Sequence, residues 1–235
     1  MEIISKQIRE DARSSLKGNW ILMVFFTLLY NNLDIIIDFI PSINSDRFSI
    51  ILTFISTALF IFGYNNIILQ ITRGNNIKFS IFFSGCKKVL KGFLMNLVIG
   101  IYTLLWSILF IIPGIIANIK YSMAYFIWAD DPDIGIDEAI NESINMTDGH
   151  KWEIFKLFFS FIGWFLLLIA LGLGIEFIIE YYITDTIFLL NNIGLIIFSI
   201  GFIYLEAYFK VSMGVLYNKL IGFKEIEENK FLLDE

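Results

Sequence analysis

The feature that most constrains this chain is a set of long apolar segments with almost no charge. The segment from 93 to 112 contains no charged residue, and 152–174 carries only Glu153 and Lys156 near its start. A helix needs about 20 predominantly apolar residues to cross the hydrocarbon core of a bilayer, and both segments reach that length. Because 57% of the residues are hydrophobic and only 17% are charged, the composition is too apolar for a typical soluble domain. The sequence therefore predicts an integral membrane protein.

Six segments are interpreted as transmembrane helices, namely 20–40, 48–71, 93–112, 114–129, 152–174 and 187–209. Three others, 3–17, 72–92 and 137–148, combine apolar and charged residues and are predicted to lie as interfacial amphipathic helices. The predicted fold class is all-α, a polytopic membrane bundle of these elements. Residues 1–220 would form a single integral-membrane domain, and 221–235 a polar cytoplasmic tail.

The centre of the chain begins with a corner at Pro113 and Gly114. Proline is tolerated at the start of a helix, and glycine permits a tight turn. Residues 114–129 would return as a helix of about 24 Å, which is either a thin crossing or half of a re-entrant hairpin. An acidic turn at 130–133 ends that helix, Asp137 is expected to cap the next one, and Gly149 to close it.

The positions of lysine and arginine favour six spans with both termini in the cytoplasm, because short cytoplasmic loops accumulate these residues. With six spans, Arg47 lies in an outer loop, and Lys120 and Lys156 lie within spans. The other cations fall on the inner side: Lys6, Arg9, Arg13, Lys17, Arg73, Lys78, Lys87, Lys88, Lys91, Lys151, Lys210, Lys219, Lys224 and Lys230. An odd number of spans would place the C-terminal lysines outside, so the even number is preferred.

A family resemblance rests on PGIIANIKYSMAYFIWADDPDIGIDEAINESINMTDGHKW, followed by FFSFIGW and ALGLG. The opening DARSSLKGNW, the LKG before the third span and residues 207–220 extend it from about 8 to 220. In these motifs the chain resembles an uncharacterised integral-membrane family of Gram-positive bacteria, domain of unknown function 975. More remotely, the pattern around Ser143 resembles the membrane domain attached to some glycerophosphodiester phosphodiesterases. The resemblance implies a location in the bacterial plasma membrane and no established activity.

Two departures from the family pattern accompany this resemblance. Residues of about 175–200 look like extra sequence, and Lys120 stands where a small polar residue is expected.

The sequence contains few residues that could carry out catalysis. It has one cysteine and one histidine, and it lacks the metal, nucleophile and phosphate-binding motifs that hydrolases share. His150, which with Gly149, Lys151 and Trp152 forms a structural motif, is interpreted as an interfacial residue at a helix end, with acid–base catalysis as the alternative. The acidic turn is interpreted as a solvated helix stop, with cation binding as the alternative. We therefore expect no catalytic residue, no cofactor and no metal.

Lys120 is the main candidate for a functional residue. A lysine near the middle of a bilayer is costly unless it is paired or reaches water, so it marks a candidate site. Asp34 is the expected partner by depth, and the alternatives are a structural ion pair or a lysine whose amine reaches the interface. Asn118 and Asn96 complete this candidate intramembrane polar site, with interhelical hydrogen bonding as their simpler role.

These observations favour an integral membrane protein that is a non-enzymatic accessory or protective factor of the envelope, acting through lipid or protein contacts. The alternative is a small transporter or channel that uses Lys120 and Asp34, and a lipid-modifying enzyme is third. The expected partners are the lipid bilayer and, as a second candidate, another membrane protein. No nucleic-acid partner is expected, and the oligomeric state is open.

Overall fold

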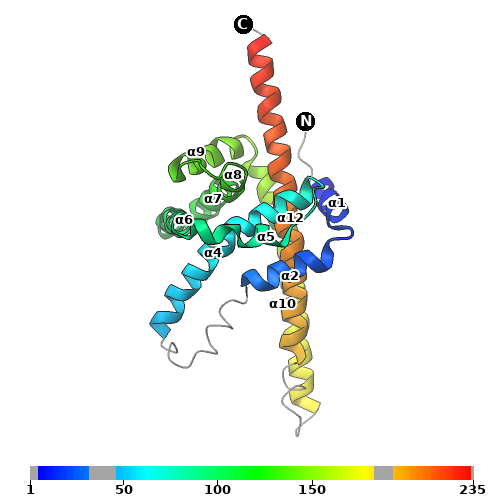
Figure 1. Ribbon diagram of the computed structural model, residues 1–235. Helices are drawn as coiled ribbons and strands as arrows, with labels where there is room; N and C mark the ends of the chain where they lie inside the picture. The colour runs from blue at the N-terminus through cyan, green and yellow to red at the C-terminus, as the bar shows by residue number, and fades with distance from the viewer. Residues whose placement is uncertain (1–4, 32–45, 183–192, 234–235) are drawn as a thin grey trace.

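The computed structural model describes residues 5–31, 46–182 and 193–233, and the regular structure within these ranges is helical. This confirms the all-α prediction (Figure 1). The helices are α1 (Ser5–Leu16), α2 (Trp20–Asn31), α4 (Asp46–Thr72), α5 (Phe79–Phe82), the 3₁₀ helix η2 (Phe83–Lys88), α6 (Val89–Leu109), α7 (Ile111–Tyr121), α8 (Ala124–Asp130), α9 (Ile136–Thr147), α10 (Lys151–Tyr182) and α12 (Ile193–Leu233).

Within the described residues, four helical stretches are long and apolar enough to cross a membrane: Phe79–Leu109, Ile111–Asp130, Lys151–Ile179 and Ile193–Gly222. They overlap the predicted spans 93–112, 114–129, 152–174 and 187–209. The predicted span 48–71 falls within α4, of which Thr57–Thr72 is a shorter apolar helix. For the predicted span 20–40, α2 ends at Asn31 and residues 32–40 lie outside the described residues. Six spans therefore remain a prediction.

Two helical hairpins dominate the arrangement. Helices α10 and α12 run side by side along the long axis of Figure 1, while α6 to α9 lie on one side of α12 and α1 on the other. In the second hairpin, extended backbone at Phe110 separates α6 from α7. A Cβ atom on Gly114 would lie 2.3 Å from Ser107 Oγ, so glycine permits the two helices to approach closely. The corner therefore lies at Phe110, and Pro113 sits within the first turn of α7.

The amphipathic helices α1 and α9 bury their apolar faces in the protein. Ile8, Ala12 and Leu16 of α1 are fully buried, and α1 packs mainly against α12. Ala139 and Ile140 of α9 are buried where that helix contacts α7 and α8. The apolar stripes were thus identified correctly, but in the structure they contact other helices. The third predicted interfacial segment, 72–92, does not form a separate amphipathic helix. It contains α5 and η2, which lead directly into α6.

The predicted helix ends are mostly confirmed. Gly18 and Gly149 have φ of 88° and 77°, the left-handed conformation that ends α1 and α9. The cap of α9 is Gly135, whose N–H faces the Glu138 carboxylate at 3.5 Å, so the prediction of Asp137 at that position was wrong by two residues. Helix α12 continues through the predicted tail to Leu233.

Candidate functional site

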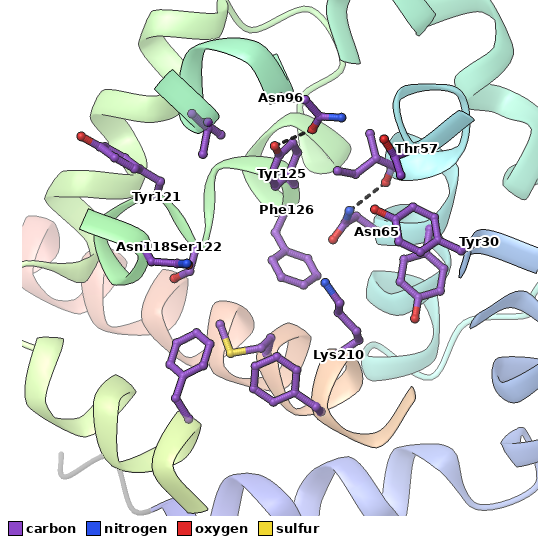
Figure 2. A pocket seen from close by; sticks show the side chains of 17 residues that line it. Tyr30, Thr57, Asn65, Asn96, Asn118, Tyr121, Ser122, Tyr125, Phe126 and Lys210 are labelled. Carbon is purple, nitrogen blue, oxygen red and sulfur yellow. Dashed lines mark hydrogen bonds between the residues drawn. The ribbon is translucent and has the colours of Figure 1, made fainter. Parts of the chain in front are cut away.

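A polar pocket of about 490 Å³ lies where α4, α6, α7, α8 and α12 meet (Figure 2). Its walls also include Tyr30 of α2 and Phe158 of α10. Amide, hydroxyl and ammonium groups line it, although it lies among apolar helices: Tyr30, Thr57, Asn65, Asn96, Asn118, Tyr121, Ser122, Tyr125 and Lys210. Such a group of polar side chains between apolar helices is typical of a binding site in a helical membrane protein.

Hydrogen bonds fix several of these side chains. Tyr125 Oη donates to Asn96 Oδ1 at 2.6 Å, which leaves the Asn96 amide nitrogen as a donor. Asn65 Nδ2 donates to the carbonyl of Ile61 at 2.7 Å, which leaves its side-chain oxygen as an acceptor. Tyr30 stacks on the ring of Tyr64 with centroids 4.6 Å apart. The pocket therefore offers both hydrogen-bond donors and acceptors.

Lys210 brings a charged group to this pocket. Its side chain reaches from α12 into the space opposite Asn65, as Figure 2 shows. Glu206, one turn earlier on α12, accepts a short hydrogen bond from Asn31 Nδ2. Within the described residues, Lys210 forms no ion pair within 4.0 Å, although the Glu206 carboxylate is close enough to act electrostatically on its ammonium. An ammonium in a helix of this kind is stabilised by polar groups or water around it, and the pocket provides such an environment.

The structure brings together part of the predicted polar site. Asn96 and Asn118 both line the pocket, as expected for a shared site. Lys120 is not among the lining residues, and Asp34 lies outside the described residues. The pairing of Lys120 with Asp34 therefore stays a prediction.

Lys120 instead lies beside α9 and the loop that follows it. The Ser143 hydroxyl donates to the Lys120 carbonyl at 2.6 Å and accepts from the Met123 N–H at 3.2 Å. Ser143 is completely buried, so it joins α9 to the break between α7 and α8. The Lys120 side chain is half-buried and close enough to Asp148 to stabilise its charge.

The motif from Gly149 to Trp152 spans the turn before α10 and the first two residues of that helix. Lys151 donates a short hydrogen bond to Asp148, which holds the pKa of that carboxyl below its usual value. The His150 N–H donates to the Thr147 carbonyl at 3.1 Å, and the His150 carbonyl accepts from Ile154 at 3.0 Å. The motif is therefore part of a helix junction.

The acidic turn after α8 is held by basic residues from two other segments. Arg73 donates two hydrogen bonds to the Asp130 carboxylate at 2.6 and 2.7 Å, which raises the pKa of the guanidinium. Lys88 and Lys91 both donate to the Pro132 carbonyl, at 2.9 and 3.1 Å. Within the described residues no group of three or more His, Cys, Asp or Glu side chains is positioned to hold a metal ion.

Sequence reasoning missed Lys210 as a pocket residue, because it was counted among the inner-side cations. The signal was nonetheless present. Lys210 follows Ala207 by three residues and precedes Gly214 by four, so all three share one helix face. Small residues on a membrane helix commonly face other helices, and a Cβ on Gly214 would lie 2.5 Å from Ile68. That face predicts an inward-pointing lysine.

Together, the fold and the pocket define a class of protein. The described helices include four that could cross a membrane, which indicates a multi-pass membrane protein. The chain belongs to the family described as "Protein of unknown function (DUF975)", whose sequence profile matches residues 1–117 and 108–224. No curated protein and no solved structure matches the chain significantly. The family resemblance is thus confirmed, and it brings no activity with it.

Proposed function

We propose that the protein binds a small anionic solute in the polar pocket and acts as a small carrier or channel. The observation that carries this proposal is the Lys210 ammonium, which lines a pocket whose largely apolar walls also carry amides and hydroxyls. A cation in a membrane helix is costly and therefore marks a functional site by default. The proposal keeps the transport alternative but assigns the charge to Lys210 instead of Lys120.

The accessory interpretation loses part of its basis. It relied on amphipathic helices whose apolar faces would lie in the bilayer. In α1 and α9 those faces are occupied by contacts with other helices. We keep the proposed function non-enzymatic because the sequence offers a single cysteine and a single histidine for catalysis.

The proposal includes a bacterial cytoplasmic membrane location, six spans and cytoplasmic termini. Its support is that segments assigned to the inner side contact one another. Lys219 of α12 pairs with Asp11 of α1 at 2.6 Å. Arg73, after α4, pairs with Asp130 at the end of α8. An arrangement with these segments on opposite sides of a membrane is incompatible with such contacts.

Charge-selective thiol labelling tests the proposed site. In a Cys86→Ser background, Asn118→Cys would be treated with an anionic or a cationic methanethiosulfonate reagent. We expect the anionic reagent to react faster, because Lys210 attracts it. At an assumed separation of about 8 Å and an effective dielectric of about 20, Lys210 attracts the anion and repels the cation by about 2 kcal/mol each, so the two rates should differ by up to about 1000-fold. Lys210→Gln should remove that preference.

Ile108→Cys serves as the control, because Ile108 is 72% exposed on the apolar surface of α6 and should face lipid. Neither charged reagent should modify it. The proposal is wrong if Asn118→Cys resists both reagents, or if the anionic preference persists in the Lys210→Gln variant. Labelling from the outside and then from inverted vesicles would identify the side from which the pocket is reached.

A further inference from the structure

A second concave surface lies beside α1, away from the polar pocket. Residues 161–171 of α10 and 201–208 of α12 form its walls, and residues 6–13 of α1 form one end. We call this surface the α1 groove; its volume is about 650 Å³. The walls are apolar or aromatic, whereas the α1 end carries Lys6, Arg9, Arg13 and one acid, Glu10. One site thus combines a cationic end with an apolar channel.

The packing of α1 holds the cations at that position. Tyr208 Oη donates to the Arg9 carbonyl at 2.8 Å, and Lys219 pairs with Asp11 at 2.6 Å. Trp20 stacks on Tyr204 with ring centroids 4.5 Å apart. Because the buried face of α1 packs against α12, the backbone of α1 places its cationic residues at the end of the groove.

The charges of the α1 end are only partly compensated. Lys6 lies 3.9 Å from Glu10, and both side chains are well exposed. Among the residues whose side chains are described, Arg9 and Arg13 form no ion pair. The α1 end therefore presents two guanidinium groups, which suit an anion with several oxygen acceptors, such as a phosphate.

The apolar walls of the groove indicate that the anion carries an apolar chain. Trp164 and Leu171 of α10 leave about half of their surface exposed, in a helix apolar enough to cross a membrane. A stretch of ten residues along α10 extends about 15 Å away from the cations. A soluble anion would use only the cationic end, whereas a phospholipid would use the cationic end and the channel together.

We propose that the α1 groove is a binding site for an anionic phospholipid of the inner leaflet, with its phosphate at Arg9 and Arg13 and an acyl chain along α10 and α12. This inference is independent of the polar pocket, since the two sites share no lining residue. Anionic lipids of the cytoplasmic leaflet are attracted by juxtamembrane cations. Here the cations lie above a groove that accommodates the chain.

Trp164 provides a local probe. The full-length protein would be reconstituted in phosphatidylcholine vesicles with a minor fraction of brominated phosphatidylglycerol or brominated phosphatidylcholine. We expect the brominated anionic lipid to quench tryptophan fluorescence more strongly at equal mole fraction. Trp164→Phe should reduce this difference to what Trp20, stacked on Tyr204 at the groove, still contributes, whereas Trp152→Phe, at a similarly exposed tryptophan outside the groove, should retain it in full.

Charge variants test the headgroup contact. Arg9→Gln and Arg13→Gln should each lower the preference for phosphatidylglycerol by about fivefold. Lys78→Gln with Lys87→Gln removes two exposed cations elsewhere and should leave it unchanged. Arg9→Lys with Arg13→Lys keeps the charge and should retain most of the preference, which guards against a folding defect. The proposal is overturned if the native protein shows no preference for phosphatidylglycerol, or if the double variant Arg9→Gln with Arg13→Gln keeps that preference. It is also overturned if Lys78→Gln with Lys87→Gln lowers the preference as much as the two arginine substitutions do.

Discussion

Replacing Gly63 with alanine should separate α4 from the segment that crosses it. A Cβ atom at Gly63 would lie 2.0 Å from the Phe82 carbonyl oxygen and 2.6 Å from its carbon, where 3.4 Å is an ordinary contact. Both atoms belong to the backbone, so no side-chain rotation relieves the clash. The α5–η2 segment would have to move and take with it Phe82, which is 1% exposed and stacks on Phe26 and Phe60.

The expected loss follows from two contributions. Overpacking of a helix interface costs about 1–3 kcal/mol, and full removal of a buried phenylalanine about 3–5 kcal/mol. Because Phe82 would be displaced only in part, we expect Gly63→Ala to lower the free energy of unfolding by about 3 kcal/mol. The better helix propensity of alanine returns at most about 1 kcal/mol. The close approach therefore dominates the outcome.

The assay is unfolding by sodium dodecyl sulfate in mixed micelles, followed by circular dichroism. Gly163→Ala in α10 is the matched control, because a Cβ there meets nothing within 4 Å. It should leave stability unchanged or raise it by up to about 1 kcal/mol. The reasoning is refuted if Gly63→Ala resists the detergent as well as the native protein does.

Three further changes test the junctions around the acidic turn and α9. Asp130→Asn should lower the free energy of unfolding by about 1 kcal/mol, because its ion pair with Arg73 is only partly exposed, whereas exposed Asp133→Asn should change it by less than about 0.5 kcal/mol. Ser143→Ala should cost about 1–3 kcal/mol in the same assay, because it leaves a buried N–H and C=O without their partner. Because the pKa of Asp148 is lowered, its stabilising contribution is present above the ordinary aspartate pKa and lost as pH falls through the lowered value. Lys151→Ala should raise that pKa, measurable by NMR titration of Asp148.

Periodicity and length predicted the local structure of this chain well. The four-residue spacing of Ile8, Ala12 and Leu16 identified the buried face of α1, and the glycines at 18 and 149 identified two helix ends. These features depend on residues close in sequence. The partner of the α1 face was missed, because an apolar stripe fits a bilayer surface as well as it fits another helix.

The candidate site was harder to predict because it depends on helix rotation. Lys120 and Lys210 both interrupt apolar segments, and depth along a span favoured Lys120. Helix packing instead places Lys210 at the pocket. Ala207 and Gly214 lie on the face of α12 that contacts other helices, and Lys210 lies on the same face. Asn96 and Asn118 were found because asparagine in an apolar helix usually contacts another polar group, and both line the pocket, although Asn118 is exposed.

The last prediction separates a binding role of Lys210 from a structural one. Replacement with methionine keeps the length of the side chain and removes the charge. If Lys210 serves a ligand, Lys210→Met should leave the free energy of unfolding unchanged or raise it, because a lysine between apolar membrane helices is costly. The same variant should lose the preference of Asn118→Cys for the anionic reagent.

If Lys210 instead forms a buried structural ion pair, its removal leaves an uncompensated charge and should cost about 3–5 kcal/mol. The two roles therefore predict opposite signs in one detergent-unfolding experiment. Lys120→Met is the matched comparison, because that side chain is half-buried and does not line the pocket. It should change stability by about 0.5 kcal/mol or less and leave the anionic preference intact. A large loss of stability in Lys210→Met, with the preference retained, would exclude the proposed anion site and assign Lys210 to the architecture of the helices.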